Sequence, residues 1–283
     1  METIKFTKMH GLGNDYVYID CMEGCPDRLE ELAREMSDRH CGIGGDGIIL
    51  ILPSETADFR MRMFNADGSE GAMCGNGVRC IGKYVFDHGL TDRTTITLET
   101  LSGVKYLTLF PGADGKIAKV TVDMGEPCFE PARIPLDAPS NLGVRLTVPS
   151  SGEEIELTAV SMGNPHGIIF TDDLSDANVL GIGPRLETHP IWPDRANIEF
   201  ARIEGDGDIR MRVWERGSGE TMACGTGACA TAVAAALTGH ADRDVTIHLL
   251  GGDLEIKWDE ATNHVFMTGP ATEVFSGMYA RQQ

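Results

Sequence analysis

The sequence contains no apolar run long enough to cross a membrane, and its first residues lack the apolar segment of a secretory signal. We therefore expect a cytoplasmic protein that does not bind membranes. Positive charge is also scarce, because 24 Lys and Arg stand against 43 Asp and Glu, for a formal net charge of −19. Nucleic acids and anionic membranes repel such a surface, so neither is an expected partner.

Several motifs of cofactor chemistry are absent from the sequence. It contains no Cys-x-x-Cys pair, no paired Cys/His spacing of a structural zinc site, no His-Glu-x-x-His and no P-loop. The Gly-x-Gly-x-x-Gly match at residues 42–47 precedes an apolar run that predicts a strand, whereas a dinucleotide site needs a helix there. We therefore expect neither a metal nor an organic cofactor.

Cysteine is plentiful instead: there are eight, which is many for a reducing compartment. Cys74 and Cys224 lie 150 residues apart in similar stretches, Met-Cys-Gly-Asn-Gly at 73–77 and Ala-Cys-Gly-Thr-Gly at 223–227. The other six are expected to be small buried hydrophobic side chains. These are Cys21, Cys25, Cys41, Cys80, Cys128 and Cys229.

The offset of 150 residues relates other features of the two halves. An alternating strand pattern (59–63 and 209–213) precedes each cysteine, and a helical pattern (78–86 and 228–237) follows it. A repeat this long indicates a duplicated domain. We expect an α/β (α+β) fold of two pseudo-symmetric domains, 1–125 and 126–269, divided near a proline-rich stretch. A C-terminal strand at 270–283 would complete the first domain. The offset also relates Asn14 to Asn164, Gly47 to Asn197, Arg62 to Arg212, Glu70 to Glu220 and Gly89 to Gly239.

The two cysteines are predicted to stand at helix N-termini. Unpaired backbone N–H groups there lower a thiol pKa and bind carboxylates, and the neighbouring glycines let the backbone approach a ligand. Duplicated domains usually bring equivalent loops to one cleft, so we expect both thiols at one site. One thiolate would remove the α-proton of an amino acid while the other thiol protonates the opposite face. The sequence therefore predicts a racemase or epimerase that needs no cofactor.

Two alternatives remain open. In the first alternative, the protein is a racemase or epimerase whose substrate differs from the one that the family resemblance described next implies. In the second, it belongs to a different class, and Cys74 and Cys224 form a redox disulfide or bind a metal. His166 also has two interpretations. It is either a structural residue or, because it lies beside Asn164 in a turn equivalent to the Asn14 loop, part of the site.

The chain resembles the diaminopimelate epimerase family of lysine and peptidoglycan precursor biosynthesis. The resemblance implies interconversion of LL- and meso-diaminopimelate, two domains that each curl a mixed sheet or barrel around a central helix, and a homodimer. The fold alone is shared with proline racemases and phenazine-type isomerases. The segments that carry the resemblance are 10–16, 64–70, 73–80, 161–166, 215–217 and 223–229.

The resemblance also implies roles for individual residues. Cys74 and Cys224 would be the acid/base thiols, and Arg216 would grip the distal carboxylate. His166 and Glu215 would assist the thiols. Some members carry Gln where Gly47 stands, so one substrate contact is in doubt here. The residues that would bind the substrate are Asn14, Asn65, Gly75, Asn76, Asn164, Asn197, Glu215, Arg216, Gly225 and Thr226.

Overall fold

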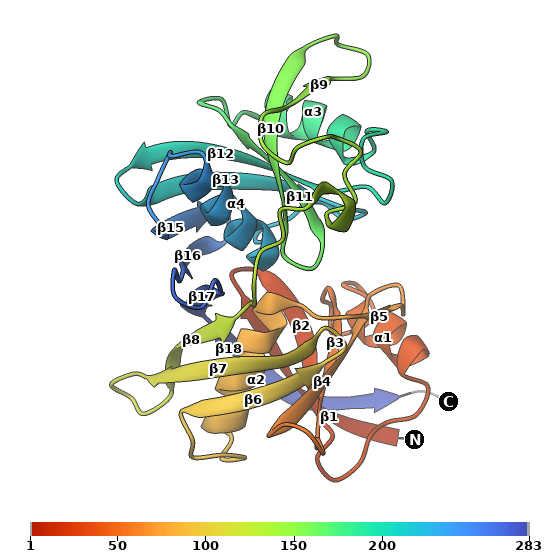
Figure 1. The fold of residues 1–283 in the computed structure, drawn as a ribbon. Helices are drawn as coiled ribbons and strands as arrows, with labels where there is room; N and C mark the ends of the chain where they lie inside the picture. Colours follow the sequence, from red (N-terminus) through yellow and green to blue (C-terminus); the bar gives the residue numbers. More distant parts are fainter. Residues whose placement is uncertain (1, 282–283) are drawn as a thin grey trace. The chain divides into compact units, whose positions relative to one another are not determined.

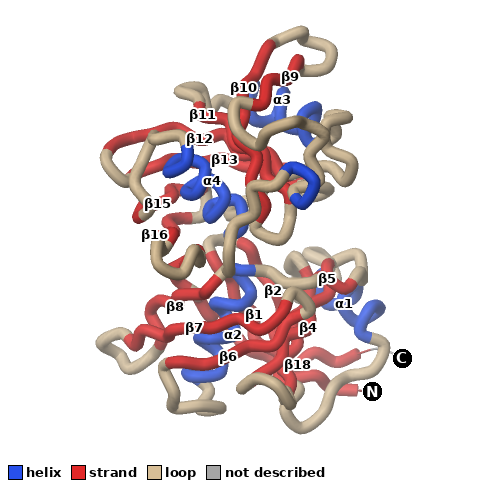
Figure 2. The backbone as a smooth tube through the Cα atoms, viewed as in Figure 1, coloured by secondary structure: helices blue, strands red, loops and turns tan. Residues whose placement is uncertain are grey.

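The computed structural model describes residues 2–281, and its regular structure is mostly strands, with few helices (Figure 2). The chain forms two compact units. The first contains the residues up to Val122 and those from Gly269 onward, and the second is Asp123–Thr268. Among the residues described, no helix is both long and apolar enough to span a bilayer.

The first unit contains a mixed sheet with the strand order β18–β1–β2–β3–β4–β6–β7–β8. The pairs β2–β3 and β4–β6 are parallel, and the other neighbours are antiparallel. Strand β18 is antiparallel to β1, so the end of the chain extends the sheet that the beginning starts. The strands are β1 (Glu2–Gly11), β2 (Asn14–Asp20), β3 (Gly47–Leu52), β4 (Phe59–Asn65), β6 (Thr95–Thr100), β7 (Gly103–Pro111), β8 (Ile117–Asp123) and β18 (Thr272–Arg281), with a short β5 (Glu70–Gly71) beside β4.

Two helices cover different parts of this sheet. Helix α1 (Leu29–Ser37) buries Leu32, Ala33 and Met36 in a core with residues of β1, β2 and β3. Helix α2 (Gly75–Asp87) is wrapped by strands of the same unit in Figure 1 and packs against β1, β7 and β18. Val78, Ile81 and Val85 are fully buried, as the 3.6-residue apolar spacing of this stretch predicts.

The second unit repeats this plan with the strand order β9–β10–β11–β12–β13–β15–β16–β17. Its parallel pairs, β11–β12 and β13–β15, correspond to those of the first unit. Helix α4 (Gly225–Leu237) has the bounds of α2 shifted by 150 residues. The strands are β9 (Val144–Thr147), β10 (Glu154–Ser161), β11 (Pro165–Phe170), β12 (Asn197–Gly205), β13 (Asp208–Glu215), β14 (Gly219–Glu220), β15 (Asp244–Leu249), β16 (Gly252–Trp258) and β17 (Val265–Pro270).

Helix α4 is buried on nearly every side, whereas most helices bury only one. The small side chains from Ala228 to Ala235 let β10, β11, β12, β15 and β16 pack closely around it. The outer face of the same sheet packs against α3 (Asp176–Glu187), which includes Pro184. The sequence pattern did not predict α3, because Gly181, Gly183 and Pro184 obscure its apolar spacing. The fold is thus a curled mixed sheet around a central helix, built twice. A short 3₁₀ turn, η1 (Pro131–Arg133), precedes β9.

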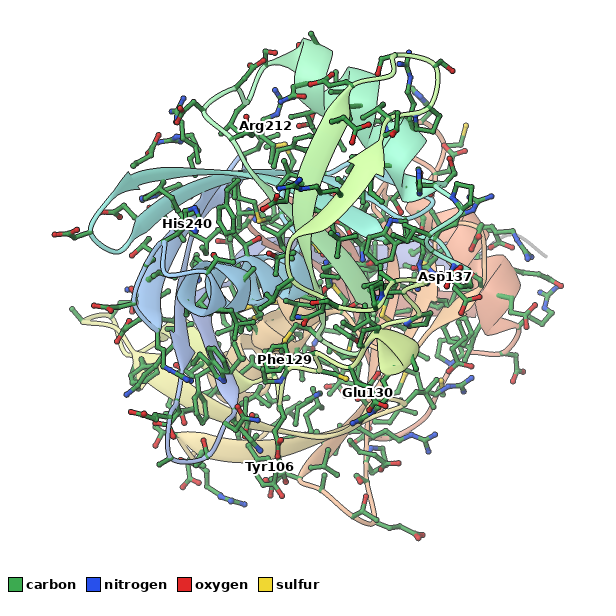
Figure 3. The ribbon with its side chains drawn as sticks, turned by 45° about the horizontal axis from the view of Figure 1, so that its top comes forward. Tyr106, Phe129, Glu130, Asp137, Arg212 and His240 are labelled. Atoms are coloured by element: carbon green, nitrogen blue, oxygen red, sulfur yellow. The ribbon has the colours of Figure 1, made fainter. Side chains whose placement is uncertain are left out.

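The same ion pair recurs ahead of each central helix. Arg62 binds Glu70 through Nε and Nη2 at 2.7 and 3.1 Å, and Arg212 binds Glu220 in the same way at 2.7 and 3.0 Å. Each pair joins the strand before the glycine-rich loop to the short strand after it. Arg212, labelled in Figure 3, also donates to the Leu174 carbonyl at 2.7 Å.

The expectation that six cysteines are buried is correct only in part. Cys21, Cys80 and Cys229 are buried, and Cys128 is half-buried. Cys25 and Cys41 are exposed, because both lie in loops that flank α1 and not in a strand or helix. All eight are free thiols in the structure.

Candidate functional site

Both cysteines of the repeat are the N-cap residues of the central helices. Cys74 caps α2 with an extended backbone, and its sulfur accepts the Gly77 N–H at 3.5 Å. Cys224 caps α4 in the same way, and its sulfur accepts the Gly227 N–H at 3.4 Å. The prediction that both stand at helix N-termini is therefore confirmed. Gly75 and Gly225 are the first residues of the two helices.

Amide side chains surround the sulfur of Cys74. The thiol donates to Asn14 Oδ1 at 3.1 Å, and Asn76 Nδ2 donates to the same oxygen at 3.3 Å. Asn14 is held in turn by Asp46, whose Oδ2 accepts Asn14 Nδ2 at 2.7 Å. The first unit thus brings together three of the predicted site residues, Cys74, Asn14 and Asn76, at the start of β2 and the start of α2.

A buried guanidinium lies one helical turn below these amides. Arg79 is fully buried and donates to Asn76 Oδ1 at 2.9 Å and to the Pro270 carbonyl at 3.1 Å. The Asn76 oxygen is therefore occupied by Arg79, and its Nδ2 points at Asn14. Arg79 orients the amide and connects the start of α2 to the segment that leads into β18.

Two further predicted residues of the first unit lie on paired strands. Asn65 ends β4 and donates to Ser69 Oγ at 3.0 Å. Gly47 begins β3 opposite Asn65, and a Cβ at that position would overlap the Phe64 carbonyl oxygen. This backbone therefore has no room for a side chain at position 47, and Gly47 serves the close pairing of β3 with β4.

The sulfur of Cys224 has carboxylates for neighbours. Glu215, at the end of β13, accepts the Thr221 hydroxyl and lies near enough to the Cys224 thiol that each affects the pKa of the other. The Thr226 hydroxyl lies 3.6 Å from the sulfur. Cys224 is only 5% exposed, so these contacts occur out of contact with bulk water. The second unit therefore joins Cys224, Glu215 and Thr226.

Burial, together with the charges of Glu215 and Glu199, raises the pKa of the Cys224 thiol well above its ordinary value. Hydrogen bonds from Thr226 and the Gly227 N–H act in the opposite direction but do not cancel these effects. The expected lowering by the helix N-terminus is present at Cys224 through the Gly227 N–H, but it is outweighed, because desolvation disfavours the thiolate more than the helix end favours it. Burial likewise raises the pKa of Glu215.

His166 and Asn164 belong to one buried chain of hydrogen bonds. His166, on β11, is fully buried, and its Nδ1 lies 2.7 Å from Glu199 Oε1. Its Nε2 lies 3.0 Å from Asn164 Oδ1. Asn164 Nδ2 donates to Thr226 Oγ1 at 3.3 Å. His166 is thus connected to the Cys224 loop through Asn164 and Thr226.

Asn197 and Arg216 meet through the backbone. Asn197 Oδ1 accepts the Arg216 N–H at 2.9 Å, and its Nδ2 donates to the Pro165 carbonyl at 3.0 Å. The Arg216 side chain is exposed and makes one hydrogen bond, to the Asp194 carbonyl, at 3.1 Å. Glu187 of α3 accepts the Gly217 N–H at 2.9 Å and fixes this loop. Most of the guanidinium remains available to a ligand.

The sequence reasoning missed Glu199, Asp46 and Glu187. Glu199 carried a readable signal, because it lies two residues after Asn197 in an otherwise apolar strand and so shares its face. Asp46 lies in the glycine-rich turn that was discounted as a dinucleotide site. Glu187 had no signal, since it lies at the end of the helix that the pattern did not predict.

Within residues 2–281, no group of three or more His, Cys, Asp or Glu side chains is placed to hold a metal ion.

The chain is similar to a known family over most of its length. The family model described as diaminopimelate epimerase matches residues 6–130 and 158–274. A diaminopimelate epimerase of Desulfovibrio desulfuricans is 57% identical over 282 residues, covering 98% of this chain and 98% of that protein. One of Acetivibrio thermocellus is 52% identical over 274 residues, covering 97% and 98%.

Solved structures agree on the fold. A Bacillus anthracis protein of the PhzF phenazine biosynthesis family has a TM-score of 0.70 at 17% identity and covers 99% of this chain and 100% of its own. A probable proline racemase of Agrobacterium radiobacter has a TM-score of 0.70 at 19% identity, with coverage of 99% and 93%. With two cysteine-capped helices in a duplicated fold and full-length relatives of this identity, the chain belongs to the diaminopimelate epimerase family.

Proposed function

We propose that this enzyme interconverts LL- and meso-diaminopimelate by moving the α-proton between two thiols, with Cys74 and Cys224 as the acid/base groups. The observation that carries the proposal is the paired capping geometry, in which each sulfur accepts an N–H of the first turn of its own central helix. One thiolate removes the α-proton, and the other thiol delivers a proton to the opposite face of the same carbon. The substrate loses one proton to the first sulfur and gains one from the second, so its composition does not change.

The helix starts supply the stabilisation that this step needs. Removing an α-proton places charge on the substrate carboxylate, and N–H groups of a first helical turn have no intrahelical acceptor. We propose that the backbone at Gly75, Asn76, Gly225 and Thr226 binds that carboxylate. These donors are fixed before the reaction begins, so they stabilise the transition state without reorganisation.

We propose that the distal end of the substrate is read by Arg216 and by amide side chains. Arg216 is exposed and has donors left for a second carboxylate, which suits a dicarboxylic substrate. Asn14, Asn65, Asn164 and Asn197 supply amide oxygens that accept hydrogen bonds from the ammonium groups. Glu215 and His166 assist Cys224, and Gly47 contributes only backbone.

The units 1–125 and 126–269 are proposed as the two epimerase domains. We also propose a cytoplasmic homodimer, because precursors of lysine and peptidoglycan are made in the cytoplasm and the family resemblance implies a dimer. Light scattering of the purified protein at several concentrations tests the oligomeric state.

Exchange of the α-proton in heavy water tests the function. Incubation of LL-diaminopimelate with the enzyme in deuterium oxide, without added cofactor, should give meso-diaminopimelate with deuterium at one α-carbon. A panel of other amino acids serves as the comparison. Exchange into a different amino acid, with none into diaminopimelate, would identify another racemase of this fold. Exchange into no substrate would reject the epimerase function.

A further inference from the structure

The buried carboxylate of Glu199 is unusual in its surroundings. Glu199 lies on β12 between Ile198 and Phe200 and is fully buried. Its Oε1 lies 2.7 Å from His166 Nδ1, while Oε2 has no hydrogen-bond partner among the described residues. A buried carboxyl group is costly unless its charge is balanced or its proton has an acceptor.

The contacts of His166 indicate where the proton resides. Nδ1 faces a carboxylate oxygen of Glu199, and Nε2 faces the amide oxygen of Asn164 at 3.0 Å. The amide oxygen of Asn164 accepts, so Nε2 donates, and one further proton is shared between Nδ1 and Glu199 Oε1. The same amide donates through Nδ2 to Thr226 Oγ1 at 3.3 Å. An imidazole is more basic than a carboxylate, which places the shared proton on Nδ1 of His166.

The direction of these hydrogen bonds continues to the thiol. Because Thr226 Oγ1 accepts from Asn164, its single proton is free to point at Cys224 Sγ, 3.6 Å away. Glu199 also lies close to the cysteine on its other side. A Cβ on Gly227 would be 2.6 Å from Glu199 Oε1 and 3.3 Å from Cys224 Sγ.

We propose that Glu199 is a positioning residue, whose carboxylate keeps His166 doubly protonated and thereby directs hydrogen bonds through Asn164 and Thr226 toward the sulfur of Cys224. With the neutral side chain of Glu199→Gln presenting its amide oxygen to Nδ1, His166 would keep the Nδ1 proton and lose the Nε2 proton, and Nε2 would become an acceptor. The Asn164 amide would then turn over to donate to Nε2, and its oxygen would take the Thr226 proton. Cys224 would lose its hydroxyl donor although no residue that contacts it had changed.

The ring protonation of His166 tests this directly. Long-range ¹⁵N–¹H correlation spectra at neutral pH, with the His166 signals assigned from a His166→Gln sample, distinguish two protonated nitrogens from one. We expect two in the wild-type protein and one in Glu199→Gln, which keeps the shape of the side chain and removes its charge. Glu199→Asp keeps the charge and should retain two. Glu156→Gln, an exposed glutamate on β10 of the same unit, is the matched control and should match the wild-type protein.

The kinetic consequence is a fall in kcat of about tenfold in Glu199→Gln, the size expected when one aligned hydrogen bond is lost, with partial recovery in Glu199→Asp. The spectra need no turnover, so they test Glu199 independently of the proposed epimerase function on which the kinetic consequence rests. A neutral His166 in the wild-type protein would overturn the proposal, even if Glu199→Gln failed to fold. Two ring protons in Glu199→Gln, or an unchanged kcat in a folded variant, would overturn it as well.

Discussion

The two cysteine loops share a backbone and differ in the groups around the sulfur. Cys74 and Cys224 cap helices of identical length and accept equivalent N–H groups. Cys74 is half-buried and donates to an amide oxygen, that of Asn14. Cys224 is buried beside the carboxyl group of Glu215. The same capping geometry thus places the two sulfurs in different electrostatic environments.

The difference extends into the helices. Position 79 of α2 is a buried arginine, and the equivalent position of α4 is Cys229, also buried. The cation of the first unit, Arg79, orients an amide, whereas the second unit has a hydrogen-bonded pair, Glu199 and His166, on neighbouring strands. Both units therefore retain the hydrogen bond from a first-turn N–H of the helix to the sulfur of its N-cap cysteine. They do not share the polar side chains around the two sulfurs.

Removal of either sulfur should have the largest effect. Cys74→Ala and Cys224→Ala should each lower turnover of diaminopimelate by roughly 10³-fold or more, because each deletes one of two acid/base groups. The measurement is α-proton exchange and epimerisation by NMR. Cys25→Ala, at an exposed cysteine outside the site, is the control and should keep full activity. Full activity in either site variant would end the two-thiol interpretation.

Removing the charge of Glu215 should lower the pKa of Cys224 toward the ordinary value of a thiol. Glu215 contributes to the raised pKa of Cys224, so Glu215→Gln should increase the thiolate fraction at neutral pH. We expect alkylation of Cys224 by iodoacetamide to become about tenfold faster, the factor that corresponds to one pKa unit. Site-resolved mass spectrometry measures it, and the alkylation rate of Cys74 in the same sample is the control. Equal acceleration of both would point to general loosening of the structure.

The raised pKa of Cys224 should also make the folded protein less stable at alkaline pH. The folded protein keeps the Cys224 proton at a pH where the unfolded chain has released it, because the folded pKa is raised. The free energy of unfolding should therefore fall as pH rises above about 8.5, by up to about 1.4 kcal/mol per unit from this group. Urea unfolding at pH 8 and pH 10 measures the fall. It should be smaller in Cys224→Ala, and an equal fall in both proteins would contradict the prediction.

The repeated ion pairs should show the smallest difference. Arg212→Met should cost more stability than Arg62→Met, about 2 kcal/mol against at most about 1 kcal/mol. The side chains of Arg212 and Glu220 are 14% and 20% exposed, against 31% and 32% for Arg62 and Glu70. Arg212 also holds the Leu174 carbonyl, which would lose its donor. Urea midpoints at neutral pH measure both, and equal costs would show that burial does not distinguish the pairs.

The backbone of the candidate site was predictable from sequence to an unusual degree. The 150-residue offset, read from Cys74 and Cys224, gave the two central helices and their capping residues, because glycine spacing and apolar periodicity are local signals. Helix α3 was not predictable in this way, since Pro184 and two glycines interrupt its pattern and tertiary packing stabilises it.

The electrostatics of the site was not readable to the same extent. The raised pKa of Cys224 depends on burial and on Glu199, a residue 25 positions earlier on another strand. Likewise, the contact of His166 with Glu199 joins two parallel strands. Long-range packing decides such contacts, and a single sequence does not record it.

The pairing of β18 with β1 has a consequence for how the protein is made. Ile4 of β1 lies opposite Tyr279 of β18, so the partner of β1 is translated after the strands of the second unit. Until then the N–H and C=O groups along one edge of β1 are unpaired and can bond to a wrong strand. The second unit by that time already has all its strands up to β16. The half that is translated first is therefore the half that is finished last.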